Sequence, residues 1–229
     1  PSEKKRERVQ TSFGNASMKT EEIKFGMNGI FPTPVYGSAN IKQITKPELD
    51  FVEEQKEETK INTNKGNLTT EHSYVLEVPV LRDLKNIIEQ HLNTYLKEVI
   101  CPVEEGIKIY ITQSWLNYTS INQYHHEHSH DNSFLSGVFY FKADKKVDGI
   151  HFKKPPSPEI LSIPYKRKNI YNITDFGFNV DKGTLLIFPS KLVHYVGIKK
   201  NPNERVSLSF NTFVKGNMGN ANEKTQLKL

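Results

Sequence analysis

The segment FLSGVFYF, residues 134–141, is a nearly continuous apolar run and predicts a strand at the centre of a sheet. A strand that is covered on both faces has no solvent side, so its sequence need not alternate with polar residues. A longer strand-like stretch precedes it at 107–118, and shorter ones follow at 184–189, 192–198 and 205–213. Many short strands separated by turns favour a sandwich or jelly roll.

Two helices are predicted before these strands. Residues 45–57 begin with Thr45 as the N-cap and Glu48 three positions later, the arrangement of a capping box. A second helix follows Pro79, because apolar residues recur there at steps of three and four. These are Leu81, Leu84, Ile88, Leu92, Tyr95, Leu96 and Val99. We expect this stripe to pack on the outside of a sheet, which gives a mainly β fold with supporting helices (α+β).

The composition excludes several classes of protein. The 229 residues carry a net charge of +5, much of it in a basic segment at 4–8 and in dispersed lysines and arginines, so a nucleic-acid partner is not expected. Cys101 is the only cysteine, which excludes an internal disulfide and fits a reducing cytoplasm. No run of 18 apolar residues exists, and the N-terminal residues lack an apolar signal core, so neither a membrane span nor secretion is expected.

Three regions are predicted along the chain. Residues 1–25 are polar and basic and read as a flexible N-terminal arm. Residues 26–214 hold the predicted jelly-roll domain, and residues 215–229 form a polar C-terminal tail.

Four histidines gather in YHHEHSHD, residues 124–131. In a strand, His126, His128 and His130 would project to the same side, and an adjacent pair could bind one metal ion. Imidazole nitrogen suits iron, zinc, copper or nickel. The plain alternative is a histidine-rich surface loop that holds no ion.

His194 and Arg205 provide a second signal, because eleven residues separate them and the intervening 199–204 is rich in turn residues. If the two flanking strands form a hairpin, His194 faces Ser209, and Arg205 lies about 13 Å further along at ~3.3 Å per residue. A metal at His194 and a guanidinium reaching back would leave a gap that fits 2-oxoglutarate. Arg205, Ser207 and Ser209 would share one face of the last strand.

These residues carry a resemblance to a known family. The chain resembles the 2-oxoglutarate-Fe(II) oxygenases related to prolyl hydroxylases, of the type found in bacteria and marine phage genomes. The match runs from about residue 29 to residue 214, through SWLNY (114–118), HSHDNSFLSGVFYF (128–141), FPSKLVHYV (188–196) and RVSLSFN (205–211).

The resemblance implies a double-stranded β-helix, or jelly roll, that uses Fe(II) as cofactor and 2-oxoglutarate as co-substrate. Residue by residue, His128 and His130 match the His-x-His element and His194 the distal histidine, so these three would be the catalytic metal ligands. Arg205 matches the arginine that binds the co-substrate, Ser207 would help it, and Asn117 lies on the strand that contributes to the same subsite.

One departure concerns the metal ligands. The common oxygenase triad is two histidines and one carboxylate, whereas the element here reads His-Ser-His. His125 with Glu127, or Asp131, could replace one of the three histidines. We prefer His128 and His130, because they stand at the matching distance before SGVFYF.

The resemblance implies hydroxylation of a substrate, with formation of succinate and CO2. A prolyl or other amino-acid side chain, in a small molecule or a peptide, is the expected class of substrate. Two alternatives remain at this point: a three-histidine cupin-type dioxygenase that does not use 2-oxoglutarate, and a non-catalytic jelly-roll module with a binding or structural role. The sequence is compatible with an oligomer.

Overall fold

The computed structural model describes residues 29–57, 66–103, 106–156 and 163–229. The chain divides into two compact units, Pro1–Thr33 and Pro34–Leu229. In the first unit, residues 29–33 are described and contain no helix or strand. The predicted arm at 1–25 lies outside the described residues. Every element named below belongs to the second unit.

Within the described residues, a large antiparallel sheet has the strand order β1-β8-β5-β10-β3-β2. Its strands are β1 (Tyr36–Ser38), β2 (Leu68–Thr69), β3 (Lys108–Thr119), β5 (Leu135–Lys142), β8 (Leu185–Pro189) and β10 (Arg205–Lys215). The apolar run predicted as a central strand is β5, which pairs with β8 on one side and β10 on the other. Seven of its eight residues are buried, because both of its faces are covered.

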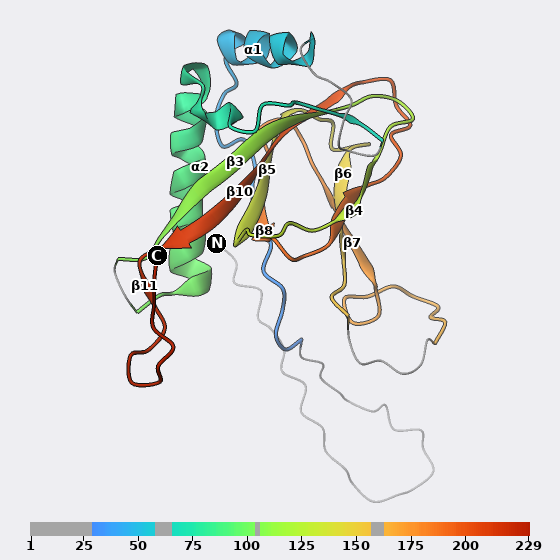
Figure 1. Ribbon diagram of the computed structural model, residues 1–229. Coiled ribbons are helices and arrows are strands. Elements are labelled where there is room, and N and C mark those ends of the chain that lie inside the picture. Colours follow the sequence, from blue (N-terminus) through green and yellow to red (C-terminus); the bar gives the residue numbers. More distant parts are fainter. Residues whose placement is uncertain (1–28, 58–65, 104–105, 157–162) are drawn as a thin grey trace, which may run out of the picture. The chain divides into compact units, whose positions relative to one another are not determined.

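A smaller antiparallel sheet has the order β4-β9-β6-β7. It comprises β4 (His125–His128), β6 (Gly149–Lys153), β7 (Asp175–Asn179) and β9 (His194–Val196). Figure 1 shows β4, β6 and β7 on one side of the large sheet and α2 (Arg82–Tyr95) on the other. The two facing sheets form the predicted jelly roll, and helices cover its outer face.

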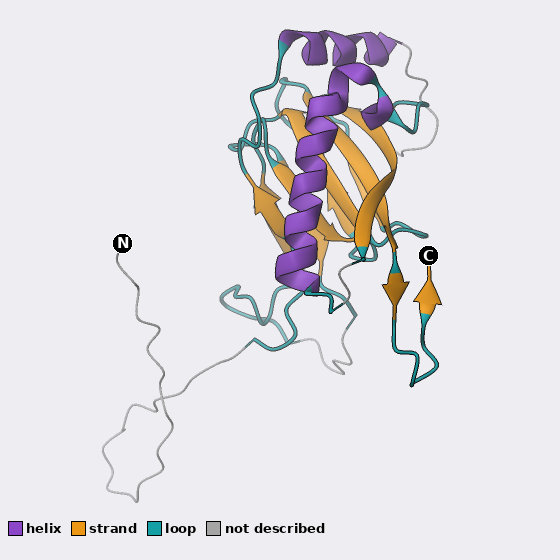
Figure 2. Cartoon of the chain, turned by 90° about the vertical axis from the view of Figure 1, so that its left-hand side faces the viewer, coloured by secondary structure: helices purple, strands orange, loops and turns teal. Residues whose placement is uncertain are grey.

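Two apolar cores follow from this layering. The larger core packs Leu84, Ile88 and Leu92 of α2 against the large sheet, including Phe139 and Leu208. Figure 2 shows α2 lying across the strands of that sheet. The smaller core fills the space between the two sheets. It contains Val138, Tyr140, Ile150, Phe152, Leu186 and Phe188. Alternate residues of β5 therefore serve opposite cores, as the period of a strand requires.

Both predicted helices are present. Helix α1 spans Lys46–Glu57, and the Glu48 carboxylate accepts hydrogen bonds from the backbone N–H of Thr45 (2.8 Å) and from its hydroxyl (2.9 Å). The predicted stripe along α2 is buried as far as Leu96, where one turn of π-helix (Leu96–Ile100) continues the chain. Val99 is the exception at 39 % exposed. Short 3-10 turns at Val75–Glu77 and Pro79–Leu81 lead into α2.

The predicted hairpin between His194 and Arg205 is wrong. Strand β9 pairs with β4 and β6 in the small sheet, whereas β10 pairs with β3 and β5 in the large one. The chain crosses from one sheet to the other between these strands. His194 and Arg205 are thus brought together across the space between the sheets rather than along one hairpin.

Residues 217–228 form a small hairpin of β11 (Asn217–Met218) and β12 (Leu227–Lys228), which was not predicted from the polar composition of this tail. Gly216 and Leu229 close it with two backbone hydrogen bonds. None of the helices in the described part of the chain has the length and apolar character that a membrane span requires.

Candidate active site

A cavity between the two sheets is lined by residues from both of them. His128 and His194 come from β4 and β9 of the small sheet. Asn117 comes from β3 of the large sheet, and Arg205 and Ser207 come from β10. His130, in the loop that follows β4, also lines the cavity. All six residues predicted for the site are therefore found there.

Three histidines meet at one point of the cavity. His128 stands directly opposite His194 in the pairing of β4 with β9, and their ring centroids are 4.3 Å apart. The ring of His130 lies 5.0 Å from that of His128 and 5.3 Å from that of His194. Its backbone N–H donates to the carbonyl of Ser190 (2.9 Å), which holds the loop against the end of β8. One potential ligand nitrogen from each ring lies within 4.8 Å of the others.

Backbone carbonyls orient two of these rings. Nδ1 of His128 donates to the carbonyl of His126 (2.8 Å), and Nδ1 of His194 donates to the carbonyl of Leu192 (2.9 Å). A carbonyl oxygen can only accept, so the proton of each neutral ring is on Nδ1 and the lone pair is on Nε2. Metal-binding histidines are commonly oriented in this way by a hydrogen bond from their second nitrogen.

The site keeps its imidazoles neutral. Burial, together with the neighbouring His128 ring, lowers the pKa of His194 to about 3 and that of His130 to about 4. Burial likewise lowers the pKa of His128. A neutral imidazole has a free lone pair, so the three side chains are ready to act as ligands near neutral pH.

Arg205 lies in the same cavity with only 2 % of its surface exposed. Its Nη2 donates to the hydroxyl of Thr119 (3.1 Å) and its Nη1 to the carbonyl of Gly149 (3.3 Å). Its buried Nε has no hydrogen-bond partner among the described residues. Burial lowers the pKa of this guanidinium, while Tyr140 and Asp148 act to raise it. A buried cation with an unused donor is suited to bind an anionic ligand, because leaving such a donor unpaired is costly.

Ser207 and Asn117 lie beside Arg205 on the large sheet, directly opposite each other in the pairing of β10 with β3. Ser207 is buried, and the Asn117 amide donates to the hydroxyl of Ser209 (3.0 Å). These residues give the wall opposite the histidines a polar surface.

Two further cavity residues were missed by the sequence analysis. Tyr140 is 1 % exposed, and burial raises its pKa to about 12. Its position in the apolar run hid it, although the strand period places it on the same face as Ser136 and Val138. His125 was considered only as an alternative ligand, and it also lines the cavity.

Strand β4 does not follow the predicted alternation of His126, His128 and His130. The pairing of β4 with β9 is irregular between His125 and His128, and the strand ends at His128. A bulge shifts the alternation by one residue. His125 and His128 therefore both reach the cavity, although an odd number of steps separates them.

The two carboxylates considered as alternative ligands lie elsewhere. Glu127 is 54 % exposed and pairs with Lys153 (2.9 Å). Asp131 is 82 % exposed and pairs with Lys191. Among the described residues, the groups of side chains suited to a metal ion consist of histidines alone.

Comparison with known proteins gives a match to one family model and a shared fold. Residues 113–211 match the model of the family described as "Putative 2OG-Fe(II) oxygenase". This match covers the second half of β3, the histidines at 125–130 and 194, and most of β10. No curated protein sequence matches the chain.

Solved structures share the fold at low sequence identity. A prolyl-4-hydroxylase from Pseudomonas putida matches with a TM-score of 0.52 and 12% identity, over 78% of this chain and 92% of that one. HygX from Streptomyces hygroscopicus, with nickel, 2-oxoglutarate and hygromycin B bound, matches with a TM-score of 0.52 and 10% identity, over 79% and 82%. An oxidoreductase of the 2OG-Fe(II) oxygenase family from Burkholderia pseudomallei matches with a TM-score of 0.51 and 11% identity, over 78% and 84%.

Proposed function

We propose that the chain is a 2-oxoglutarate- and Fe(II)-dependent oxygenase that hydroxylates a small-molecule or peptide substrate with formation of succinate and CO2, because residues 113–211 match the model of that family. The observation that carries this proposal is the meeting of three neutral imidazoles and a buried guanidinium in one cavity. His128 and His194 belong to the small sheet and Arg205 to the large one, so the site forms only when the two sheets face each other.

His128, His130 and His194 would hold the iron. The fit rests on their donor atoms, because two of the rings already donate Nδ1–H to a carbonyl and offer Nε2 as ligand. Imidazole suits ferrous iron, and a site of three neutral ligands leaves the metal more positive than one that includes a carboxylate. When bound, iron supplies the activation of dioxygen and the oxidising power for the C–H bond.

Arg205 would bind the distal carboxylate of 2-oxoglutarate. Its unpaired Nε supports this role, and a guanidinium matches a carboxylate in a two-point contact. Ser207 and Asn117 would add hydrogen bonds from the same sheet, and the Tyr140 hydroxyl lines the cavity beside them. The work of these residues is to orient the co-substrate, while Val138 and Phe188 give the cavity an apolar wall that excludes water.

The finer substrate class is part of the proposal. We expect a prolyl or other amino-acid side chain, and the prolyl-4-hydroxylase among the structures of the same fold supports this expectation by analogy. The complex with hygromycin B shows that the fold can also be used on a small molecule. We expect neither a nucleic-acid nor a membrane partner. A cytoplasmic location fits the single cysteine.

A three-histidine dioxygenase that works without 2-oxoglutarate is the second candidate, because the ligand set contains no carboxylate in the described residues. Arg205 argues against it, since the Nε of this buried guanidinium would then be left without an acceptor among the described residues. Oxygen uptake that requires 2-oxoglutarate separates the two candidates.

The direct test is an anaerobic titration of the purified protein with Fe(II) and then 2-oxoglutarate. We expect a visible charge-transfer band in the wild type and in a His72→Ala control, because His72 is an exposed loop residue. The band should vanish in His194→Ala. A wild type that gives no band with both additions, or a His194→Ala variant that keeps it, would contradict the proposal.

A further inference from the structure

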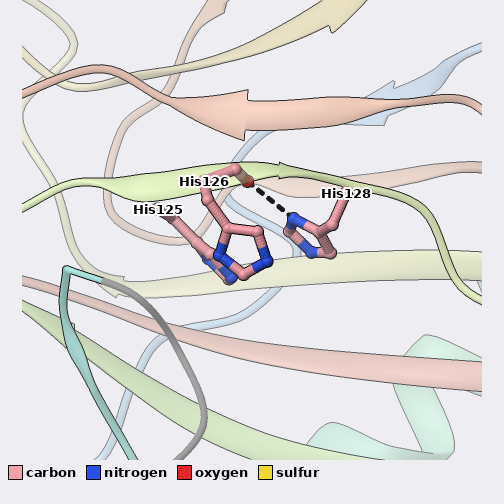
Figure 3. Close-up of side chains that lie close together, drawn as sticks. All are labelled: His125, His126 and His128. Carbon is pink, nitrogen blue, oxygen red and sulfur yellow. Dashed lines mark hydrogen bonds between the residues drawn. The ribbon is translucent and has the colours of Figure 1, made fainter.

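A second group of imidazoles lies beside the first. Nitrogens of His125, His126 and His128 also lie within 4.8 Å of one another. The rings of His125 and His128 are stacked with their centroids 4.4 Å apart, and the ring of His126 lies 5.0 Å from that of His128. Figure 3 shows the three side chains on the same side of β4.

The backbone of β4 produces this arrangement. Consecutive residues of a regular strand point to opposite faces, so His125 and His126 would normally diverge. The irregular pairing between His125 and His128 removes that alternation. Three potential ligands thus come from four consecutive residues.

An unpartnered nitrogen supports a ligand at this point. Nδ1 of His126 is buried and has no hydrogen-bond partner among the described residues. Buried polar atoms nearly always find a partner, and an exception calls for an explanation such as an ion. The carboxylate next in sequence, Glu127, is 54 % exposed and pairs with Lys153, so the group offers nitrogen ligands alone.

We propose that His125, His126 and His128 form a second site for a divalent transition metal, of which Zn²⁺ is the best fit. Three imidazole nitrogens and one open position are a familiar environment for Zn²⁺, and ions that prefer oxygen ligands are disfavoured.

The two histidine groups share His128, so a metal ion can be bound at only one of the two sites at a time. Nδ1 of His128 is occupied by the carbonyl of His126, so only its Nε2 can bind a metal. A metal held by His125 and His126 therefore withdraws His128 from His130 and His194. This consequence rests on the proposed function and makes the second site an inhibitory one, whereas the second site itself stands without it.

The test removes the first group and keeps the second. In a His130→Ala/His194→Ala background, we expect about one equivalent of Zn²⁺ to bind in equilibrium dialysis, and Co²⁺ to give a visible absorption spectrum. Adding His126→Ala should weaken Zn²⁺ binding at least about 100-fold, because even an outer-shell partner contributes 10–100-fold. Adding His72→Ala instead, as a matched control on an exposed loop, should change nothing.

Stoichiometry tests the sharing of His128. The wild type should bind one Zn²⁺, and so should His126→Ala and His194→Ala, while His128→Ala should bind none tightly. Two tight equivalents in the wild type would overturn the exclusivity. A background variant that folds, by circular dichroism, yet binds no Zn²⁺ would overturn the site, and single His130→Ala serves as the background if the double variant does not fold.

These outcomes separate the second site from the proposed function. Loss of Zn²⁺ binding in the background variant would leave 2-oxoglutarate turnover by the wild type untouched. Absence of that turnover, together with retained Zn²⁺ binding in the background variant, would remove the function and leave the second site.

Discussion

At the scale of the residue, Arg205 is the sharpest test of the co-substrate subsite. It is almost fully buried, and its two Nη atoms donate hydrogen bonds to Thr119 and Gly149. Its Nε has no hydrogen-bond partner among the described residues. Lysine keeps the charge but lacks the planar fork that meets a carboxylate at two points. We expect Arg205→Lys to raise the dissociation constant of 2-oxoglutarate at least about tenfold, or 1.4 kcal/mol. Calorimetric titration of the metal-loaded protein measures this, and Arg167→Lys on an exposed loop is the matched control. Equal affinity in the two variants would exclude Arg205 from the subsite.

The spacing of particular residues was enough to predict much of the site from the sequence alone. His128, His130, His194 and Arg205 were predicted together, and the structure gathers them in one cavity. Tyr140 was not predicted, because a tyrosine inside an apolar run looks like a core residue. The backbone carbonyls that orient His128 and His194 could not be predicted either, because the pattern of side chains does not show where a carbonyl will point.

At the scale of the element, the start of α1 depends on one buried carboxylate. Glu48 is 2 % exposed, caps the helix at Thr45 and pairs with Lys42. We expect Glu48→Ala to lower the free energy of unfolding by about 1–3 kcal/mol, because it leaves buried donors without an acceptor. Glu54→Ala, on an exposed position of the same helix, should stay within about 0.5 kcal/mol of wild type. Urea unfolding measures both, and an equal effect of the two changes would contradict the role given to Glu48.

Local patterns predicted these elements better than their pairing. Helix α1, helix α2 and the strands β3, β5, β8 and β10 all match predicted segments. The hairpin from β9 to β10 was wrong because the same alternation of residues suits a neighbour in either sheet, and only tertiary packing decides between them. Strands β6 and β7 were missed, since GIHFK and DFGFN are short and include glycine. The bulge in β4 likewise follows from its partner β9 and not from its own sequence.

At the scale of the whole molecule, the helical layer and the two sheets have different roles. The core under α2 stabilises the large sheet, and the smaller core between the sheets leaves room for polar side chains at one end. This arrangement buries several imidazoles, which the fold keeps in their neutral form. The metal-free protein therefore carries a pH sensitivity that follows from the architecture of the site.

Stability of the metal-free protein should fall as the pH drops below about 6.5, the pKa of an unfolded histidine. Burial lowers the folded pKa of His125 to about 2, of His194 to about 3 and of His130 to about 4. Between those values and 6.5 the unfolded chain binds more protons, so acid favours unfolding, whereas the contribution of these groups is complete above 6.5.

Thermal unfolding in a chelator from pH 7.5 to 4.5 tests this pH dependence. The window lies above the range where Asp131 and Asp175 titrate, because their pKa values are lowered from 3.8. We expect the midpoint temperature of the wild type to fall steadily below pH 6.5. The fall should be shallower in His194→Asn, which removes one of the titrating groups, and unchanged in His72→Asn. A wild-type midpoint that is constant from pH 7 to 4.5 would mean that these imidazoles are not held neutral by the fold.

Saturating metal should raise the midpoint temperature of unfolding most at the upper end of this pH range, because the histidine ligands must lose their protons to bind the metal.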